Sequence, residues 1–443
     1  MKHLWRQILF FTFAVTFLIS APLVVFYTAG YRYQFGSTHI IKTGVLTISS
    51  IPKNASIILD NVLSKKRTPA VIDNLFPGQT TVRIEKPEYS TWEKTLQIES
   101  GVSVFIANAT LFLNGTPEPF TKYTNILTAS HLDENTIAYL TKEQSEIHLR
   151  IHNSAYGNDQ SIWKKPLIAN ATYSLIWSPD GQYILVEEKT TVKKYILIHP
   201  ADASVVALPF KNNSSLWWDI GSPHELYAQT QKGVDVFGID THPQLPKNIK
   251  AENTRRQNGR LVVIQSQDQS IVSYVDETGI SSIVAYLPVG SYKFVPSPSW
   301  EFLLNDPKRN KLILIDPAQK NPILLQEDAT IWQWAKDNDR LLFTNGYEAK
   351  IFSVGSKNME TITRFSDPIT KLMWYPTENL IVYSQLNSIK ALELDRRDKR
   401  NETTLVEGYT ITDFWMDKEG LSLIFLGNKE KEPVGLFKRI LQK

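Results

Sequence analysis

Residues 175–188 read LIWSPDGQYILVEE: an apolar run with a tryptophan, a Ser-Pro-Asp-Gly turn, and a second apolar run. Proline presets φ for a turn, and glycine accepts the left-handed conformation that tight hairpins need. The stretch therefore predicts two antiparallel strands joined by a hairpin. The same order of apolar run, polar turn and apolar run returns through the rest of the chain.

Eight such pairs of runs follow one another. Their first members begin at residues 136, 183, 226, 261, 302, 341, 380 and 421, so the steps between them are 35 to 47 residues long. A repeat of about 40 to 45 residues with several strands is typical of a β-propeller blade. We therefore expect an all-β protein whose residues 124–443 form a propeller. Eight blades are favoured, and seven remain possible if a terminal repeat supplies only a closing strand.

An aromatic residue recurs a few positions before these turns, at Trp177, Trp217 or Trp218, Phe294, Trp334, Trp374 and Trp415. Large flat side chains at one repeated position fill the wedge between neighbouring sheets. We interpret these aromatic residues as packing residues rather than as a stacking surface for a ligand. The best-preserved copy, Trp177, Ser178, Pro179, Asp180 and Gly181, resembles the blade motif of TolB-like and WD40-like propellers.

The N-terminal region contains an uncharged segment, residues 8–29. At about 1.5 Å per residue, a helix of this length crosses the roughly 30 Å hydrocarbon core of a bilayer. Lys2 and Arg6 precede it, so the positive-inside rule places a short tail, residues 1–7, in the cytoplasm and the rest of the chain outside. A cleaved signal peptide is the alternative, but its apolar region usually has only about 7 to 15 residues. We therefore predict a single-pass anchor in the cell membrane.

From Gly44 onward the apolar residues alternate with polar ones. GVLTISS, ASIILDN, TTVRIEK, KTLQIES and VSVFIANATLFL are short runs rich in Val, Ile and Thr, separated by turn residues. They predict five or more antiparallel strands that form a small β-sandwich over residues 44–113. Residues 114–123 have the Pro, Gly and Thr content of a linker.

Two segments of this region, residues 50–61 (SIPKNASIILDN) and residues 67–94, resemble the PEGA domain family. The matching positions are Pro52, Ala55, Thr68, Pro69, Pro77, Gly78 and Tyr89. Lys53 and Asn54 stand where the family has Glu and Gly. The resemblance implies a module of bacterial envelope proteins that contacts surface-layer components or glycans, and it carries no catalytic residues to transfer.

The composition and the motifs of the sequence exclude several classes of functional site. The chain has no cysteine, and 48 Lys and Arg against 45 Asp and Glu give no sign of the basic face that a nucleic-acid binder needs. The G-x-S-x-G, H-E-x-x-H and P-loop motifs do not occur. His148 and His152 would lie about 13 Å apart on one strand, too far to share a metal. We therefore expect no catalytic residue, no metal and no cofactor.

The remaining charged residues fit turns and hairpin tips. Asp235, Asp240, Asp316 and Asp395 end or border the second runs, where they would cap strand ends. Residues 395–400 (DRRDKR) and 65–67 (KKR) are basic runs, which we interpret as solvated tips. Binding of these runs to an anionic polymer or lipid is the alternative.

These observations favour a membrane-anchored, extracytoplasmic scaffold of the bacterial envelope. Its propeller would present a rigid surface to a protein or to a cell-wall glycan, because a preformed platform needs little ordering on binding. The alternative is an extracytoplasmic propeller enzyme, a lyase or glycan hydrolase acting on cell-surface polymer. A cluster of acidic residues with His or Tyr at the mouth of the propeller channel would favour the enzyme.

Overall fold

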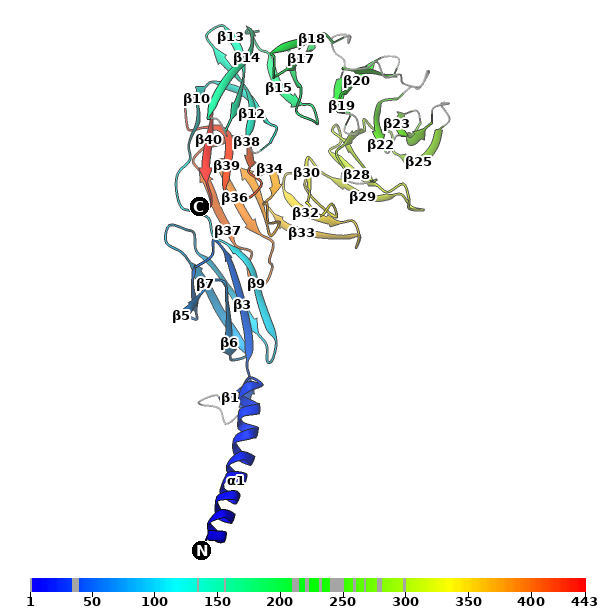
Figure 1. Ribbon diagram of the computed structural model, residues 1–443. Helices are drawn as coiled ribbons and strands as arrows, with labels where there is room; N and C mark the ends of the chain where they lie inside the picture. The colour runs from blue at the N-terminus through cyan, green and yellow to red at the C-terminus, as the bar shows by residue number, and fades with distance from the viewer. Residues whose placement is uncertain are drawn as a thin grey trace. The chain divides into compact units, whose positions relative to one another are not determined.

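The computed structural model describes residues 2–33, 40–133, 135–154, 157–208, 215–219, 223–230, 233–239, 251–257, 260–266, 268–276, 281–297 and 300–443. The chain forms two compact units (Figure 1). The first unit contains Met1–Gly115, Leu392–Thr403 and Leu441–Lys443, and the second contains Thr116–Ala391 and Thr404–Ile440.

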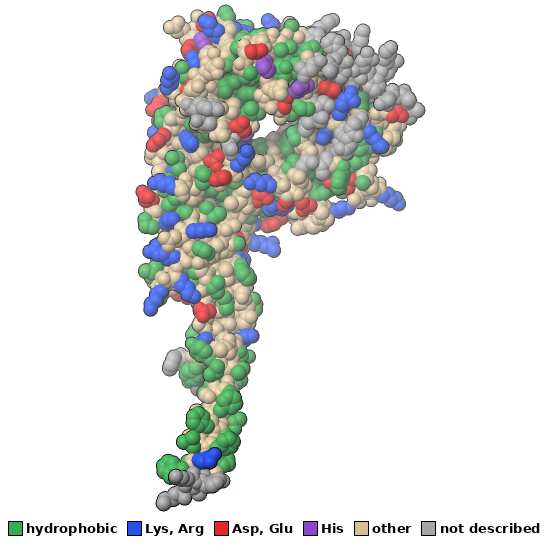
Figure 2. Space-filling view, in the orientation of Figure 1, with side chains coloured by type: hydrophobic (Ala, Val, Ile, Leu, Met, Phe, Trp, Pro, Cys, Tyr) green, Lys and Arg blue, Asp and Glu red, His purple; other side chains and the backbone are tan. Residues whose placement is uncertain are grey.

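The first element is a long helix, α1 (Lys2–Thr28). Its segment Trp5–Thr28 is long and apolar enough to cross a membrane, a test that a signal sequence also passes, and none of its most apolar stretch is buried. Hydrophobic side chains cover the helix on the face seen in Figure 2. A short hairpin follows, in which β1 (Tyr31–Tyr33) pairs with β2 (Ile40–Lys42).

Seven strands then form a two-sheet sandwich: β3 (Gly44–Ile51), β4 (Ser56–Leu59), β5 (Val62–Arg67), β6 (Ala70–Leu75), β7 (Gly78–Glu85), β8 (Trp92–Ile98) and β9 (Ser103–Thr110). One sheet has the order β6-β3-β9 and the other β5-β4-β7-β8. Buried and more exposed residues alternate along β3 and β8, as the period-two pattern of the sequence predicts. Leu46, Ile48, Ile57, Ile84 and Leu96 lie in the core between the sheets.

The prediction of a wholly antiparallel sandwich is wrong for one pair, because β3 and β9 run parallel. Parallel neighbours require a long crossover connection. Here the chain leaves β3, builds β4 to β8, and only then returns to pair β9 with β3. As a result β9 is an outer strand of its sheet, and β8 is an outer strand of the other.

The second unit contains eight small sheets in the part of the chain that is described. The first four are β11 (Ile126–His131), β12 (Thr136–Glu143), β13 (Glu146–Asn153) and β14 (Asn158–Pro166); β15 (Thr172–Trp177), β16 (Ile184–Lys189), β17 (Lys193–His199) and β18 (Ser204–Val206); β19 (Ser215–Trp218), β20 (Glu225–Thr230) and β21 (Gly233–Gly238); β22 (Asn253–Gln257), β23 (Arg260–Ser266), β24 (Ser270–Val275) and β25 (Ser281–Leu287).

The next three sheets are β26 (Lys293–Val295), β27 (Phe302–Asp306), β28 (Lys311–Ile315) and β29 (Ile323–Asp328); β30 (Ile331–Trp334), β31 (Arg340–Thr344), β32 (Glu348–Ser353) and β33 (Asn358–Arg364); β34 (Ile369–Trp374), β35 (Leu380–Gln385), β36 (Ser388–Glu393) and β37 (Glu402–Glu407). The last sheet contains β38 (Thr410–Met416), β39 (Ser422–Asn428) and β40 (Gly435–Ile440), and its outer strand is β10 (Glu118–Thr124). Within this unit the sheets follow one another around a ring (Figure 1).

The ring closes between the two ends of the second unit. Strand β10, from its beginning, pairs with β40, from its end. A shared core, in which Ile137 and Tyr139 of the first sheet pack with Trp415 and Leu426 of the last, fills the joint. The predicted linker, residues 114–123, is therefore wrong for residues 118–123, which belong to β10 and complete the last sheet.

The predicted fold class is confirmed: an apolar helix, a β-sandwich and a β-propeller. The eight pairs of apolar runs are the second and third strands of the sheets, from β12–β13 to β39–β40. The tryptophans at the ends of β15, β30 and β34 lie on the first strands. Eight sheets, rather than seven, are present in the described residues.

Candidate binding groove

Four of the predicted motif positions of the sandwich meet at one turn. Thr68 Oγ1 lies 2.5 Å from Ser50 Oγ and accepts the backbone N–H of Ala55 at 2.9 Å. The backbone of Thr68 also bonds Asn54 and Ala55, so the residues after Pro52 are held against the residue that precedes Pro69. Ala55 is fully buried, and Thr68 is 3% exposed. These positions therefore build a turn and offer no reactive group to solvent.

The other three motif positions support the frame of the sandwich. Pro77 precedes β7, and Gly78 opens it with a φ of +144°. Tyr89 packs against the core and forms an isolated backbone bridge with Leu113. None of these contacts brings polar side chains together into a site.

The blade motif at residues 177–181 is a network of turn hydrogen bonds. Ser178 Oγ donates to Asp180 Oδ1 at 2.6 Å and accepts the N–H of Tyr183 at 2.9 Å. Gly181 has a φ of +73°, and Pro179 is exposed at the bend. Burial opposes ionisation of Asp180, but hydrogen bonds from Ser178, Gln182 and His224 outweigh it and lower the pKa of Asp180. The motif thus stabilises its own hairpin.

The recurrent tryptophans join neighbouring sheets. The indole N–H groups of Trp177, Trp334 and Trp374 donate to the carbonyls of Ser130, Pro296 and Gln333, each on the preceding repeat, at 3.2, 3.3 and 3.2 Å. Trp415 lies in the core between the last sheet and the first. A second cleft, of about 360 Å³, is lined by Trp177, Gln182 and His199 among others, but the polar atom of Trp177 is already used.

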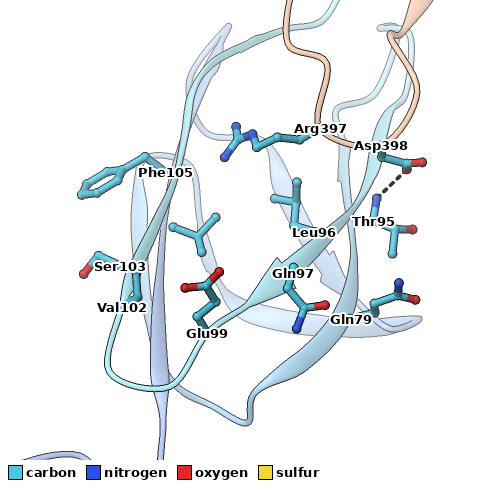
Figure 3. A pocket seen from close by; sticks show the side chains of 11 residues that line it. Gln79, Thr95, Leu96, Gln97, Glu99, Val102, Ser103, Phe105, Arg397 and Asp398 are labelled. Atoms are coloured by element: carbon cyan, nitrogen blue, oxygen red, sulfur yellow. Dashed lines mark hydrogen bonds between the residues drawn. The ribbon is translucent and has the colours of Figure 1, made fainter.

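The larger cavity lies on the sandwich, in the first unit (Figure 3). We call it the β8–β9 groove; its volume is about 680 Å³, and it is lined by Gln79, Thr95, Leu96, Gln97, Glu99, Val102, Ser103, Val104, Phe105, Arg397 and Asp398. Its two walls are the outer strands β8 and β9, which belong to different sheets. A cavity of this size is within the range of about 300 to 1,000 Å³ that is usual for ligand sites.

The β9 wall of the groove is apolar and open. Phe105 is 59% exposed and Val102 is 44% exposed. The strand itself, SVFIANAT, contains no charged residue and no proline. No other strand pairs with its outer side among the described residues.

The β8 wall is partly covered by residues 392–403, which belong to the same unit. Asp398 Oδ2 accepts the backbone N–H of Thr95 at 2.8 Å, and this bond lowers the pKa of Asp398. Arg397 forms a fork with both carboxylate oxygens of Asp395 at 2.6 to 3.1 Å. Residues 396–399 of the predicted solvated tip are exposed, and Asp395 and Asp398 in this run also make specific bonds.

A buried lysine anchors this segment. Lys94 is fully buried, and its Nζ lies 3.2 Å from Glu393 Oε2 and 3.6 Å from Asp395 Oδ2. It also donates to the backbone carbonyl of Asp395 at 2.6 Å. Trp92 Nε1 donates to Glu393 Oε1 at 3.2 Å. A buried ammonium needs such partners, since an unpaired one would be strongly disfavoured.

The other candidate residues stay apart. His148 pairs with Glu146 at 3.4 Å, whereas His152 lies 3.0 Å from Asp159. No group of three His, Cys, Asp or Glu residues within the described part of the chain could hold a metal ion. Asp316 is buried, and its carboxylate accepts the N–H of Ala318 as a turn cap. Asp235 lies on β21, and Asp240 lies outside the described residues.

Residues 43–110 match the PEGA domain family. The expected PEGA-like sandwich is therefore confirmed, and the β8–β9 groove lies on the PEGA domain together with residues 397 and 398. The match covers the sandwich alone, so it does not classify the rest of the chain. No curated protein matches the sequence.

Solved structures resemble the propeller. The C-terminal WD40 domain of Sif2 aligns with a TM-score of 0.51 and 12% identity, over 73% of this chain and 98% of that one. Sqt1 from Saccharomyces cerevisiae aligns with a TM-score of 0.49 and 10% identity, over 74% of this chain and 98% of that one. A eukaryotic initiation factor aligns with a TM-score of 0.49 and 12% identity, over 80% of this chain and 95% of that one. At these identities the first likeness shows the WD40-type fold alone. A PEGA domain on a chain with a propeller suggests a binding or scaffold role.

The groove could not be predicted from the sequence. Lys94 is the first residue of the run KTLQIES, and nothing nearby marks it as an anchor, because its partners lie about 300 residues later. The one available signal was the uncharged run VSVFIANATLFL, an edge strand without protective charges. That signal has meaning only once β9 is known to be an outer strand.

Proposed function

We propose that this protein is a membrane-anchored binding protein of the bacterial envelope. In this proposal α1 tethers the chain, and the PEGA domain and the propeller lie outside the membrane, where they hold a protein partner. The role is non-catalytic. The observation that carries the proposal is the exposure of α1, none of whose most apolar stretch is buried by the rest of the protein.

The surface of α1 supports a lipid environment. Phe10, Phe11, Phe13 and Phe17 are each 67 to 71% exposed, and the flanking Leu9, Leu18 and Ile19 are 60 to 69% exposed. A contiguous apolar surface of this kind is unfavourable in water and marks a membrane or protein contact. Because Lys2 and Arg6 lie before the uncharged residues 8–29, the positive-inside rule favours a cytoplasmic N-terminus.

The two β units supply a preformed surface. In the propeller, hydrophobic cores between consecutive sheets, such as that of Leu140, Leu149 and Ile184, fix each sheet against the next. Binding to a surface that is already ordered loses little conformational entropy. This property suits a protein that holds a partner near the membrane.

The absence of cysteine from the chain allows a direct test. Single cysteines are introduced by Gln7→Cys and Lys66→Cys, and intact cells are treated with a membrane-impermeant maleimide. Lys66 is an exposed residue of the PEGA domain, so Lys66→Cys should be labelled in intact cells. Gln7→Cys should be labelled only after lysis. Labelling of Gln7→Cys alone in intact cells would reverse the proposed orientation.

Deletion of residues 1–29 provides the second arm of the test. The full chain should float with membranes after an alkaline carbonate wash, and the deletion variant should stay in the soluble fraction. The mass of the membrane-bound protein separates an anchor from a signal sequence. A mature form that lacks α1, found in the soluble fraction, would refute the anchor.

A further inference from the structure

We propose that the β8–β9 groove binds an extended peptide segment of a partner protein, which adds to the free edge of β9 as a new strand. The inference rests on the proposed binding role and names the kind of partner that this site would take. It is carried by the backbone of β9, by the side chains in the groove, and by the segment that already contacts the opposite wall.

The backbone of β9 has hydrogen-bonding groups to spare on one side. Val45 N–H donates to Val102 O at 3.1 Å, so the carbonyl of residue 102 faces β3. Successive residues of a strand direct their N–H and C=O groups to opposite sides, and the groups of Ser103 and Phe105 therefore face away from β3. No strand pairs with that side of β9 among the described residues.

The groove also has an apolar floor. Leu96 from β8 and Val104 from β9 both line it, and Leu96 is 1% exposed. In Figure 3 the Leu96 side chain extends into the space between the two strands. Alternate side chains of an added strand point to opposite faces, so every second residue would pack on this floor. An incoming segment with apolar residues at alternate positions fits.

Residues 103–106 of β9, before the register shift at residues 107–108, lack the charges and prolines by which proteins often prevent strand addition. Natural edge strands carry lysines, prolines or inward-pointing charges. Strand β5, an outer strand of the other sheet, has Lys65, Lys66 and Arg67 in succession. Strand β9 has none of these residues. The same small domain therefore protects one edge with charge and leaves another uncharged.

The groove is continuous with an existing contact between β8 and another segment of the chain. Asp398 lines the groove and already caps the edge of β8 by accepting the N–H of Thr95. The carboxylate of Glu99, which also lines the groove, has no ion pair within the described residues. The positive charge of Arg397 is paired with Asp395. The unpaired negative charge favours a segment that carries a basic residue at the end that meets Glu99.

The probe is a fluorescein-labelled synthetic peptide, Lys-Val-Thr-Val-Thr-Val-Thr, titrated against the full chain in detergent with anisotropy as the readout. Phe105→Pro removes the outward N–H, and proline is tolerated on edge strands at positions whose N–H faces away from the sheet. We expect this variant to bind the probe about tenfold more weakly. Phe105→Thr keeps the N–H and should bind within about threefold of the original protein. Ser103→Pro is a second variant of the same kind, for use if Phe105→Pro unfolds.

Hydrogen exchange gives an independent readout. Bound probe should slow exchange in residues 103–107 and leave residues 62–67 of β5 unchanged. Glu99→Gln should weaken binding of the lysine-bearing probe. Binding of a probe with threonine in place of lysine should not change.

Three results would overturn the inference: no binding at millimolar probe, equal binding by Phe105→Pro and the original protein, or a self-association without probe that Phe105→Pro abolishes. The last result would assign the edge to a second copy of the chain. Failure here leaves the maleimide and flotation results of the proposed function intact, so the two failures are distinguishable.

Discussion

Strands β8 and β9 form the two walls of one groove, but the edge of β8 is covered by another segment of the chain and the edge of β9 is not paired with any described strand. Both are outer strands of their sheets. On β8, Asp398 caps the N–H of Thr95, and Lys94 is buried with two carboxylates from residues 392–403. On β9, the outward groups of Ser103 and Phe105 pair with no strand among the described residues, and the strand carries no charge. The comparison shows that an edge strand can be closed by a distant segment of the same chain and its neighbour left open.

The difference also shows what residues 392–403 contribute. They contain the end of β36, the connection after it and the start of β37, but they belong to the first unit. Without them Lys94 would lose both carboxylates and the carbonyl of Asp395, and the Thr95 N–H would lose its acceptor. The segment therefore completes the PEGA domain. The C-terminal residues contribute in the same way, since Gln442 Nε2 donates to Leu111 O at 2.6 Å.

The largest expected effect comes from removing the charge that anchors the closed wall. Lys94→Met keeps the length of the side chain but leaves Glu393 and Asp395 without their cation. We expect a loss of about 3 kcal/mol in the local stability of β8, at the low end for broken buried pairs because both carboxylates keep other donors. Urea-dependent hydrogen exchange of residues 92–98 and 392–403 measures it.

Lys66→Met is the matched control for this change. Lys66 pairs with Asp73 at 3.6 Å, but both side chains are more than half exposed. Pairs of this kind contribute about 0 to 1 kcal/mol, so the control should shift exchange little. Equal effects from the two variants would show that Lys94 is not a structural anchor.

The contrast between the walls explains which parts of the structure could be predicted from the sequence. The propeller could be predicted because its sequence pattern is local and repeated. Each repeat has a first-strand tryptophan such as Trp177, a turn such as Ser178–Gly181, and then two apolar runs. Strand alternation likewise predicted the sandwich. The groove could not be predicted, because it depends on pairings between distant parts of the chain. The parallel pairing of β3 with β9 makes β9 an edge, and Asp395, which binds Lys94, lies 301 residues further along the chain.

The second-largest expected effect is the loss of stability of the β8 wall at low pH, because acidification protonates two of its aspartates, Asp395 and Asp398. Burial opposes ionisation of Asp395, but hydrogen bonds from Arg397 and the charge of Lys94 outweigh it and lower the pKa of Asp395. The bond from Thr95 lowers the pKa of Asp398. Carboxylates with lowered folded-state pKa values stabilise the fold above the unfolded value of about 3.9 and lose that contribution as pH falls through the folded-state pKa.

Protection of residues 392–403 against hydrogen exchange should therefore stay constant from pH 8 to pH 5, after correction for the intrinsic pH dependence of exchange. It should then decrease below about pH 4. Asp398→Asn, which cannot titrate at this position, should show a smaller decrease. A loss of protection centred near pH 6 would instead implicate a histidine and contradict the assignment to these aspartates.

The smallest expected effect is the removal of the cap alone. Asp398→Ala deletes the acceptor for Thr95 N–H, whereas Asp398→Asn retains an oxygen that can accept the same bond. Because Asp398 is exposed at the surface, water can replace its carboxylate, and overall unfolding should change far less than in Lys94→Met. Exchange at Thr95 should nevertheless become faster in Asp398→Ala and stay nearly unchanged in Asp398→Asn. If the alanine variant also gains affinity for the Val-Thr probe, the cap is what distinguishes the two walls, since its removal would give β8 the same open edge that β9 has.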